Sequence, residues 1–341
     1  MIIIMKKNAT EEEIKNIIKE IENKGFQALV TDGIERKVIG IKGDVSTIDS
    51  ELFYKTGVEE VKRISRPYKL VSREFIPKDT VIDIEGIKIG GSNSPVIIAG
   101  PCAVESREQI IETAKAVKEA GAHILRGGAF KPRSNPYSFQ GLKEVGLEYL
   151  KEAGEITGMP TDSEAVGESY VKLVSEYCSI IHIGARNGKS FELLKKAGKI
   201  GKQSRKPILL KRGENATVKE FLGAAEYIAN EGCSDIILCL RGIRTYENKE
   251  NGFQRYTPDL GSISVLKKKT HLPVIFDPSH AAGDREYVRS LCRGAIAMGA
   301  DGLMVETHLD PDNAKSDAPQ QVRPKTLQKI IEDVNLIYKK K

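Results

Sequence analysis

The chain lacks the features that mark disulfide scaffolds, exported proteins and membrane proteins. Its five cysteines, an odd number, are scattered without a CxxC pair, which argues against a disulfide framework and favours a reducing compartment. The apolar start Met1 to Met5 is followed by lysines and is too short for a signal peptide. No later apolar run approaches the roughly 20 residues that a membrane span needs. These absences predict a cytoplasmic protein without a membrane partner.

A large excess of charge of one sign is also missing. The 53 Lys and Arg residues stand against 47 Asp and Glu residues, which leaves a net charge of +6 spread over 341 residues. So modest a charge gives no reason to expect a nucleic-acid partner, but an anionic substrate would account for part of it. The length suggests roughly two domains, with enough residues to bury a large core.

The first 66 residues predict a small α/β domain. Thr10 is followed by three glutamates, which is an N-cap signal, and isoleucines then recur at helical spacing. The expected elements are strands at 1–5, 27–31, 37–41 and 58–64, a helix from Thr10 and a second helix over 46–54. This βαββαβ order is typical of a ferredoxin-like domain, which serves either as an oligomerisation scaffold or as a ligand-sensing module. Residues 67–93 then form a connector that contains a predicted strand pair at 80–84 and 87–89.

Residues 94–341 alternate strand and helix eight times. The predicted strands start at Val96, His123, Met159, Ile180, Pro207, Ile236, Pro273 and Gly302. Eight β-then-α units in about 250 residues match a (β/α)8 TIM barrel, so the expected fold class is α/β. A doubly wound sheet is the alternative, but no glycine fingerprint of a dinucleotide site follows the first strand.

Possible metal ligands stand at the ends of three apolar runs. Cys102, His280 and Glu306 each follow such a run, and Asp317 lies in a polar loop eleven residues past Glu306. Barrel active sites are built at the C-terminal ends of the strands, so we expect these side chains to converge. A thiolate, an imidazole and two carboxylates suit a single site for a divalent metal. Each residue alone is more often a packing residue, so the prediction depends on the set.

Basic side chains gather at the same strand ends. They are Arg126, Lys131, Arg133, Arg186, Lys211 and Arg241, and Glu164 is an acidic neighbour that either orients an arginine or contacts substrate. Placing so many positive charges close together costs free energy unless anions compensate them. Arginine makes fork-like contacts with phosphate and carboxylate, so we expect substrates that carry phosphate.

The motifs at these positions resemble those of 3-deoxy-D-arabino-heptulosonate 7-phosphate (DAHP) synthases. They read GPCAVES at 100–106, LRGGAFKPRSNPYSFQG at 125–141, IGARN at 183–187, LLKRG at 209–213 and DPSHAAG at 277–283. The resemblance spans the whole chain and is to the short type of the family, which carries an N-terminal ferredoxin-like domain. It implies a metal-dependent, aldol-like condensation of phosphoenolpyruvate with D-erythrose 4-phosphate. The products are DAHP and phosphate, and the reaction is the first step of the shikimate pathway to chorismate and the aromatic amino acids.

The resemblance also implies roles for the site residues. The implied metal ligands are Cys102, His280, Glu306 and Asp317, which would hold one manganese, iron, zinc or cobalt ion. The implied phosphoenolpyruvate residues are Arg126, Lys131, Arg186, Lys211 and Arg241, with Arg133 and Ser134 at the phosphate of erythrose 4-phosphate. Lys131, His280 and Cys102 are the expected catalytic residues, and Lys131 is the expected proton donor to the new hydroxyl. A homotetramer inhibited by tyrosine or phenylalanine through the N-terminal domain completes these expectations.

Two rival functions stay open on the sequence. One is 3-deoxy-D-manno-octulosonate 8-phosphate synthase, whose loop typically reads Lys-Ala-Asn-Arg-Ser where this chain has Lys-Pro-Arg-Ser at 131–134. The other is an inactive amino-acid-binding regulator, which the intact ligand set argues against. The chain also departs from the pattern of the DAHP synthases at Leu240 and Asp162 and in short insertions near 201–206 and 251–254.

Overall fold

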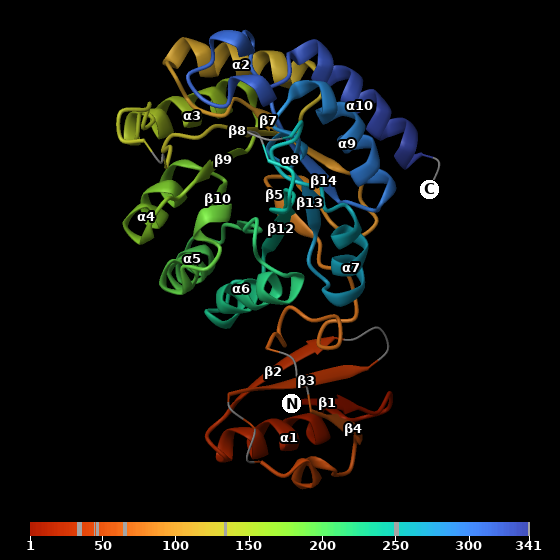
Figure 1. Cartoon of the computed structure of the whole chain (residues 1–341). Coiled ribbons are helices and arrows are strands. Elements are labelled where there is room, and N and C mark those ends of the chain that lie inside the picture. The colour runs from red at the N-terminus through yellow and green to blue at the C-terminus, as the bar shows by residue number, and fades with distance from the viewer. Residues whose placement is uncertain are drawn as a thin grey trace. The chain divides into compact units, whose positions relative to one another are not determined.

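The chain folds into two compact units. The computed structural model describes residues 1–32, 36–43, 45, 48–63, 67–132, 135–248 and 252–339 (Figure 1). One unit comprises Met1–Asp79 with Lys268–His271, and the other comprises Thr80–Lys267 with Leu272–Lys341. The domain boundaries expected from the sequence, at 66 and 93, stay predictions.

The first unit contains a four-stranded antiparallel sheet in the order β2-β3-β1-β4. Its strands are β1 (Ile2–Met5), β2 (Gln27–Asp32), β3 (Lys37–Lys42) and β4 (Val58–Lys62). Helix α1 (Glu11–Asn23) begins with a capping box between Thr10 and Glu13, as the N-cap signal predicts. Its apolar stripe packs into the core of the sheet, which includes Ile3 and Phe53. The ferredoxin-like prediction is thereby confirmed.

The second helix predicted for this domain, over 46–54, is wrong in its described part. Only a 3₁₀ turn forms there, η1 (Ser50–Phe53), and residues 46 and 47 lie outside the described residues. The side chain of Asp49 accepts a hydrogen bond from the backbone N–H of Glu51, so the turn starts late. The C-cap Tyr54 has ψ 87°, which ends it after four residues. One turn suffices to bury Phe53.

The second unit is a closed parallel barrel of eight strands. The strands are β7 (Val96–Gly100), β8 (Ile124–Arg126), β9 (Thr161–Glu164), β10 (Ile180–Ile183), β11 (Ile208–Lys211), β12 (Ile236–Leu240), β13 (Val274–Phe276) and β14 (Gly302–Glu306). Each predicted start lies within two residues of the observed one, which confirms the TIM barrel. The prediction succeeds because barrel strands are buried on both faces and read as apolar runs.

Helices surround the barrel (Figure 1). They are α2 (Arg107–Glu119), α3 (Glu144–Thr157), α4 (Glu168–Tyr177), α5 (Phe191–Ser204), α6 (Val218–Asn230), α7 (Gly261–Lys269), α8 (Pro278–Ala282), α9 (Arg285–Ala297) and α10 (Pro324–Tyr338). Three further 3₁₀ turns are η2 (Ala185–Asn187), η3 (Pro311–Asn313) and η4 (Ala318–Gln320). Among the described residues, no helix combines the length and the apolar character that crossing a bilayer demands.

A hairpin covers the N-terminal end of the barrel. It consists of β5 (Ile82–Ile84) and β6 (Ile87–Ile89), which confirms the strand pair predicted in the connector. The turn uses Glu85 and Gly86, both at positive φ, as a tight hairpin turn requires. The isoleucines of the hairpin pack against barrel residues that include Ile124 and Ile180, the first residues of β8 and β10. The opposite, C-terminal end is where the site forms.

The end of β7 tolerates only glycine. Gly100 has φ +150°, and a Cβ there would lie 2.1 Å from the backbone oxygen of Arg126. We expect Gly100→Ala to lower the free energy of unfolding by more than about 2 kcal/mol, because the clash is with backbone. Gly223 in α6 is the matched control, since its Cβ would meet nothing within 4 Å. Gly223→Ala should be neutral or stabilise by roughly 0.5–1 kcal/mol. Urea unfolding of both variants measures the contrast, and equal stabilities would contradict the argument.

Candidate active site

All eight strand ends contribute a polar or charged side chain to the C-terminal face of the barrel. In strand order these are Cys102, Arg126, Glu164, Arg186, Lys211, Arg241, His280 and Glu306. Asp317 comes from the loop before η4 and has a left-handed backbone with φ 49°. Two other predicted site residues, Arg133 and Ser134, lie outside the described residues.

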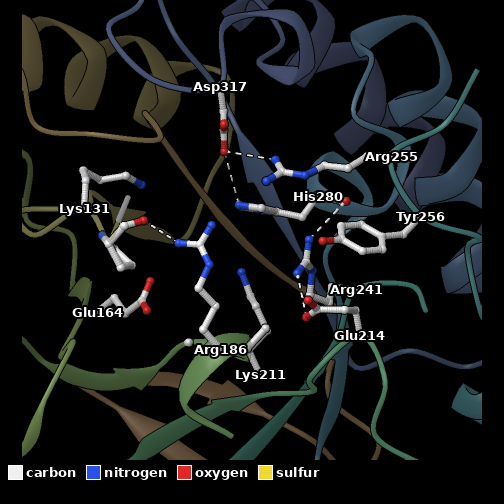
Figure 2. Close-up of a pocket in the computed structure, with 13 residues that line it drawn as sticks. Lys131, Glu164, Arg186, Lys211, Glu214, Arg241, Arg255, Tyr256, His280 and Asp317 are labelled. Atoms are coloured by element: carbon white, nitrogen blue, oxygen red, sulfur yellow. Dashed lines mark hydrogen bonds and ion pairs between the residues drawn. The ribbon is translucent and has the colours of Figure 1, made fainter. Parts of the chain in front are cut away.

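A pocket opens at this face of the barrel (Figure 2). Its lining consists of Lys131, Pro132, Glu164, Gly184, Ala185, Arg186, Lys211, Glu214, Arg241, Arg255, Tyr256, His280 and Asp317. Five of these side chains are Lys or Arg, so the pocket is suited to anions. Arg126, by contrast, does not appear in the lining. It is buried behind the pocket and donates to Glu306 over 2.7 Å.

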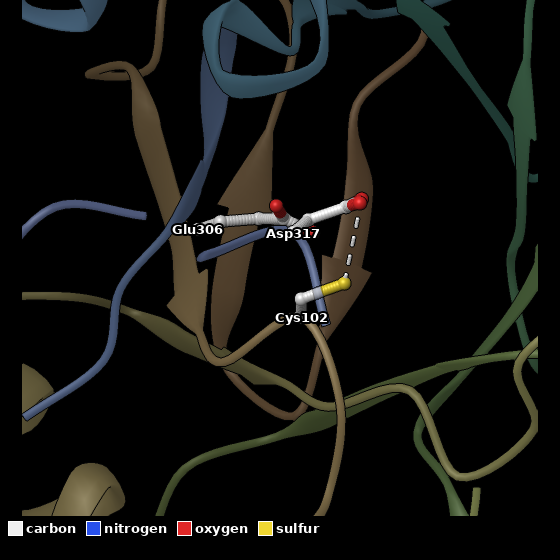
Figure 3. A group of neighbouring side chains, drawn as sticks. All are labelled: Cys102, Glu306 and Asp317. Atoms are coloured by element: carbon white, nitrogen blue, oxygen red, sulfur yellow. Dashed lines mark hydrogen bonds between the residues drawn. The ribbon is translucent and has the colours of Figure 1, made fainter. Parts of the chain in front are cut away.

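Three of the four predicted metal ligands form one cluster (Figure 3). Ligand atoms of Cys102, Glu306 and Asp317 all lie within 4.8 Å of one another. The fourth residue, His280, faces the same point. Its Nε2 lies 3.6 Å from an oxygen of Glu306 and 3.8 Å from an oxygen of Asp317. The structure therefore brings together all four residues that the sequence predicted as ligands.

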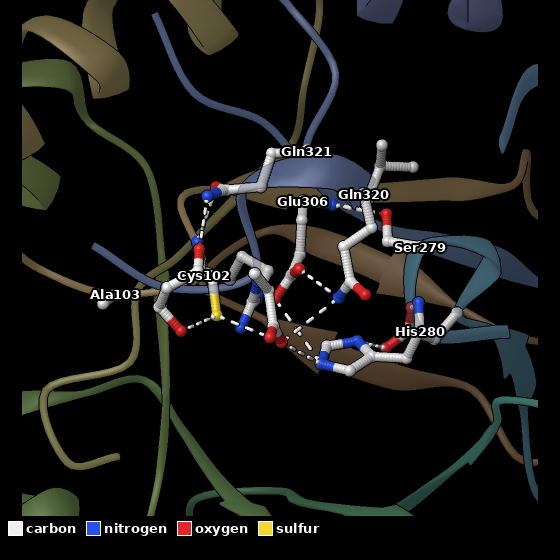
Figure 4. A network of polar contacts seen from close by, with 12 residues as sticks. Cys102, Ala103, Ser279, His280, Glu306, Gln320 and Gln321 are labelled. Atoms are coloured by element: carbon white, nitrogen blue, oxygen red, sulfur yellow. Dashed lines mark hydrogen bonds and ion pairs between the residues drawn. The ribbon is translucent and has the colours of Figure 1, made fainter. Parts of the chain in front are cut away.

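The Cys102 side chain is fully buried within a polar network (Figure 4). Its sulfur lies 3.0 Å from Ser316 Oγ and 3.0 Å from the ammonium of Lys131. Its backbone N–H donates to Gln321 Oε1. Burial, together with the charge of Glu306, raises the pKa of the Cys102 thiol to about 12. A bound cation would offset both effects and favour the thiolate.

His280 is oriented by a carboxylate that the sequence reasoning left without a role. Asp277 accepts a hydrogen bond of 2.7 Å from Nδ1 of His280 and one of 2.6 Å from Nζ of Lys211. With Nδ1 donating, Nε2 presents its lone pair to the ligand cluster. Burial lowers the pKa of His280, which keeps the imidazole neutral as metal binding requires. Burial opposes ionisation of Asp277 too, but His280 and Lys211 outweigh it and hold the pKa of Asp277 well below its usual range.

Other polar partners hold the two carboxylate ligands. Gln320 donates from one nitrogen to Glu306 over 2.6 Å and to Asp317 over 3.3 Å. Arg255 donates to Asp317 over 3.2 Å and to the side-chain oxygen of Gln320 over 3.0 Å. Burial opposes ionisation of Asp317, but the cations Arg255 and Lys131 outweigh it and hold the pKa of Asp317 far below its ordinary value. Sequence reasoning missed Gln320 and Arg255, whose only signal was proximity to Asp317 and to the 251–254 insertion.

The donor set fits a divalent transition metal. Two carboxylates and the lone pair of a neutral imidazole face one another at under 4 Å, which is repulsive unless a cation lies among them. Of the cations already present, Arg126 donates to Glu306, and Arg255 donates to Asp317 and is also held by Gln320. A mixed set of sulfur, nitrogen and oxygen donors suits manganese, iron, zinc or cobalt more than magnesium or calcium.

The anion-binding side of the pocket depends on close backbone approach. A Cβ on Gly184 would lie 1.9 Å from Oε1 of Glu164, so a side chain there would displace that carboxylate. Arg186 donates to the backbone oxygen of Pro132, which ties it to the loop that carries Lys131. Leu240, one of the departures from the DAHP synthase pattern, is buried in β12 and precedes Arg241.

The other departure, Asp162, also lies in the barrel. It is buried in β9, and its Oδ2 lies 3.2 Å from Nδ1 of His182 in β10. Neither of the two side chains belongs to the pocket lining.

Comparison with known proteins agrees with this arrangement. The profile described as the DAHP synthetase I family matches residues 78–339, and that of the DAHP synthase ferredoxin-like domain matches residues 1–66. The chain is 48% identical over 335 residues to a phospho-2-dehydro-3-deoxyheptonate aldolase of Thermotoga maritima, which covers 98% of this chain and 96% of that protein. A 2-dehydro-3-deoxyphosphooctonate aldolase of Caulobacter vibrioides is 29% identical over 263 residues, 72% of this chain and 88% of its own length.

Solved structures match equally well. The crystal structure of phospho-2-dehydro-3-deoxyheptonate aldolase (DAHP synthase) from Thermotoga maritima has a TM-score of 0.77 at 46% identity, covering 99% of this chain and 96% of that one. A truncated form of 3-deoxy-D-arabino-heptulosonate 7-phosphate synthase from the same organism has a TM-score of 0.72 at 45% identity, covering 80% of this chain and 97% of that one.

The bridge that Asp277 forms between Lys211 and His280 is expected to contribute strongly to the stability of the fold. Asp277→Asn keeps the shape but leaves the buried ammonium of Lys211 without its carboxylate, so the free energy of unfolding should fall by about 3–5 kcal/mol. Asp312 is the matched control, because it likewise pairs with two basic side chains, Arg285 and Arg323, but is 65% exposed. Asp312→Asn should cost no more than about 1 kcal/mol. Denaturant unfolding of both variants at neutral pH is the measurement. A loss of similar size at both positions would argue against the bridge.

Proposed function

The chain belongs to the DAHP synthetase I family of enzymes, and we propose that it condenses phosphoenolpyruvate with D-erythrose 4-phosphate to give DAHP and phosphate. The observation that carries the proposal is the convergence of a Cys/His/Glu/Asp ligand set and five cations on one face of the barrel. Both substrates are phosphate esters, which is the chemistry that such a pocket suits. This reaction would be the first step of the shikimate pathway, carried out in the cytoplasm.

One divalent transition metal is part of the proposal. Cys102, His280, Glu306 and Asp317 would hold it, and when bound it supplies Lewis-acid polarisation of the aldehyde. His280 would also lie between the metal and the phosphate side of the pocket, since Asp277 links it to Lys211.

The chain's own residues position the reactants and move the protons. Lys211, Arg186 and Arg241 line the pocket and would bind the phosphate and carboxylate of phosphoenolpyruvate, with Arg126 acting from behind Glu306. Arg133 and Ser134 would bind the phosphate of erythrose 4-phosphate. The third carbon of phosphoenolpyruvate attacks the aldehyde carbon, water adds to the second carbon, and phosphate leaves by carbon–oxygen cleavage.

Lys131 is the proposed proton donor to the new hydroxyl oxygen. Its ammonium lies 3.0 Å from both the sulfur and the backbone oxygen of Cys102, and the residue also lines the pocket. It therefore reaches both the ligand cluster and the space where substrate binds. Glu164 would orient the neighbouring arginines or contact substrate directly.

A five-carbon sugar phosphate is the rival substrate, because the Caulobacter relative is named for the octulosonate reaction. The Lys-Pro-Arg-Ser sequence at 131–134 and the higher identity to the Thermotoga DAHP enzyme favour the four-carbon aldehyde. The deciding experiment measures phosphate release from phosphoenolpyruvate with erythrose 4-phosphate and, separately, with arabinose 5-phosphate. Faster turnover of the five-carbon sugar would replace the proposal.

Metal removal should abolish turnover. We expect a strong chelator to inactivate the enzyme and one equivalent of manganese, iron, zinc or cobalt per chain to restore it, because four donors converge on one point. Cys102→Ala should bind metal at least about tenfold more weakly, since it removes the thiolate. Cys233→Ala, a buried cysteine outside the pocket lining, is the control and should keep full metal content. Metal analysis after gel filtration measures this, and full turnover by metal-free enzyme would refute the role of the metal.

Lys131→Ala should lower turnover far more than it weakens binding. A lost proton donor costs about 10²- to 10⁴-fold in kcat. The KM for phosphoenolpyruvate should change by less than about fivefold, because Arg186, Lys211, Arg241 and Arg255 still line the pocket. Steady-state kinetics separates the two parameters. A raised KM with unchanged kcat would make Lys131 a simple anion-binding residue.

The N-terminal domain is proposed to be a regulatory module that responds to tyrosine or phenylalanine within a homotetramer. Its core is separate from that of the barrel, and the structure of a truncated relative has been solved. Removing residues 1–66 should leave an active barrel whose rate no longer responds to either amino acid. Coupling energies of about 1–3 kcal/mol predict that saturating effector shifts the full-length enzyme's apparent substrate affinity roughly 5- to 150-fold. Inhibition that survives truncation would place the effector site on the barrel.

A further inference from the structure

The guanidinium of Arg241 is buried yet weakly held by hydrogen bonds. The side chain is 6% exposed, and its Nε has no hydrogen-bond partner in the described part of the chain. Its remaining polar contacts are long, at 3.5 Å to the backbone oxygen of His280 and 3.7 Å to Oε2 of Glu214. A buried cation needs compensation, and contacts of this length leave most of the donors of Arg241 free for an anion in the pocket.

An aromatic ring supplies the close contact that hydrogen bonds do not. The guanidinium carbon of Arg241 lies 4.3 Å from the centre of the Tyr256 ring, and that of Arg255 lies 5.9 Å from the same ring (Figure 2). The first distance is within the range of a direct cation–π contact. A guanidinium stacked on a ring keeps its plane and its outward N–H groups in a fixed direction.

The backbone around Tyr256 fixes the ring in place. The N–H of Tyr256 donates to Ala281 and that of Arg255 to Ala282, both in α8, which also carries His280. Thr257 exchanges hydrogen bonds with Ile243 in both directions. The ring therefore lies on a segment that is anchored to the helix of the metal-site histidine and to the chain just after Arg241.

We propose that Tyr256 and Glu214 are positioning residues, which hold the Arg241 guanidinium in the plane in which it binds the anionic groups of phosphoenolpyruvate. Glu214 lies between Arg241 and Arg244, at 3.7 and 3.8 Å, and restrains the guanidinium from the side of the β11–α6 loop. The Tyr256 ring supports the guanidinium from the face over which it lies. This inference rests on the proposed function, since it assigns the anion to phosphoenolpyruvate.

The proposal predicts a selective kinetic effect. Tyr256→Leu should raise the KM for phosphoenolpyruvate about 3- to 30-fold, with kcat and the KM for erythrose 4-phosphate within about twofold of wild type. Tyr256→Phe keeps the ring and should restore the KM to within about twofold of wild type. Glu214→Gln should raise the same KM about 3- to 10-fold.

The experiment measures steady-state kinetics of the full-length, metal-loaded enzyme by phosphate release. Tyr246→Leu, which removes a fully exposed ring from the same loop, is the matched control and should change neither KM. In an Arg241→Lys background, whose ammonium cannot stack as a plane, Tyr256→Leu should change the KM for phosphoenolpyruvate less than about twofold. This cycle distinguishes action through Arg241 from direct contact with substrate.

The outcomes separate the two levels of the argument. If the wild-type enzyme releases no phosphate from the two substrates, the proposed function fails. If it does, and Tyr256→Leu leaves the KM for phosphoenolpyruvate unchanged or impairs both substrates equally, the inference alone is overturned. An equal effect of Tyr256→Leu in the wild-type and Arg241→Lys backgrounds would likewise overturn it.

Discussion

The interaction on which the site depends is the pair of hydrogen bonds that Asp277 accepts from Lys211 and His280. Lys211 ends β11, Asp277 follows β13, and His280 lies in α8, the helix after β13; β11 and β13 flank β12 in the barrel. One buried carboxylate thereby sets the direction of a metal-type imidazole and of an anion-binding ammonium together. A shift of this carboxylate would move the imidazole and the ammonium together, so the distance between the metal-ligand side and the anion-binding side of the pocket would stay constant.

Charge compensation explains why so many ionisable groups tolerate burial here. Each acid in the cluster has at least one cationic or amide partner. Arg126 and Gln320 donate hydrogen bonds to Glu306, and Arg255 donates one to Asp317. Charge compensation is incomplete at two places. The ligand cluster retains donor atoms that face one another, and Arg241 retains free N–H groups. A cation at the first place and an anion at the second would complete it. The geometry is thus that of a site arranged around charges it does not itself supply.

Much of this architecture could be predicted from the sequence, for identifiable reasons. The barrel strands are uninterrupted apolar runs, so their starts were predicted to within two residues, and a barrel brings all their C-terminal ends to one face. The helix predicted over 46–54 failed because the local preference of Asp49 for a cap overrode a weak apolar period. Gln320 and Arg255 were missed because neither lies at a strand end. Their positions follow from long loops folding over the site, and only tertiary contacts show that both reach Asp317.

The β5–β6 hairpin has a consequence for how molecules enter and leave the barrel. Isoleucines fill the N-terminal end of the barrel, and the pocket that the described residues form lies at the C-terminal mouth. In the proposed reaction, two reactants and two products would share this mouth. The reactant that binds deeper in the pocket has to enter before the other reactant blocks the mouth. The product formed at the deeper position can leave only after the outer position has emptied. The three buried isoleucines of the hairpin thus favour an ordered binding of substrates and release of products over a random one.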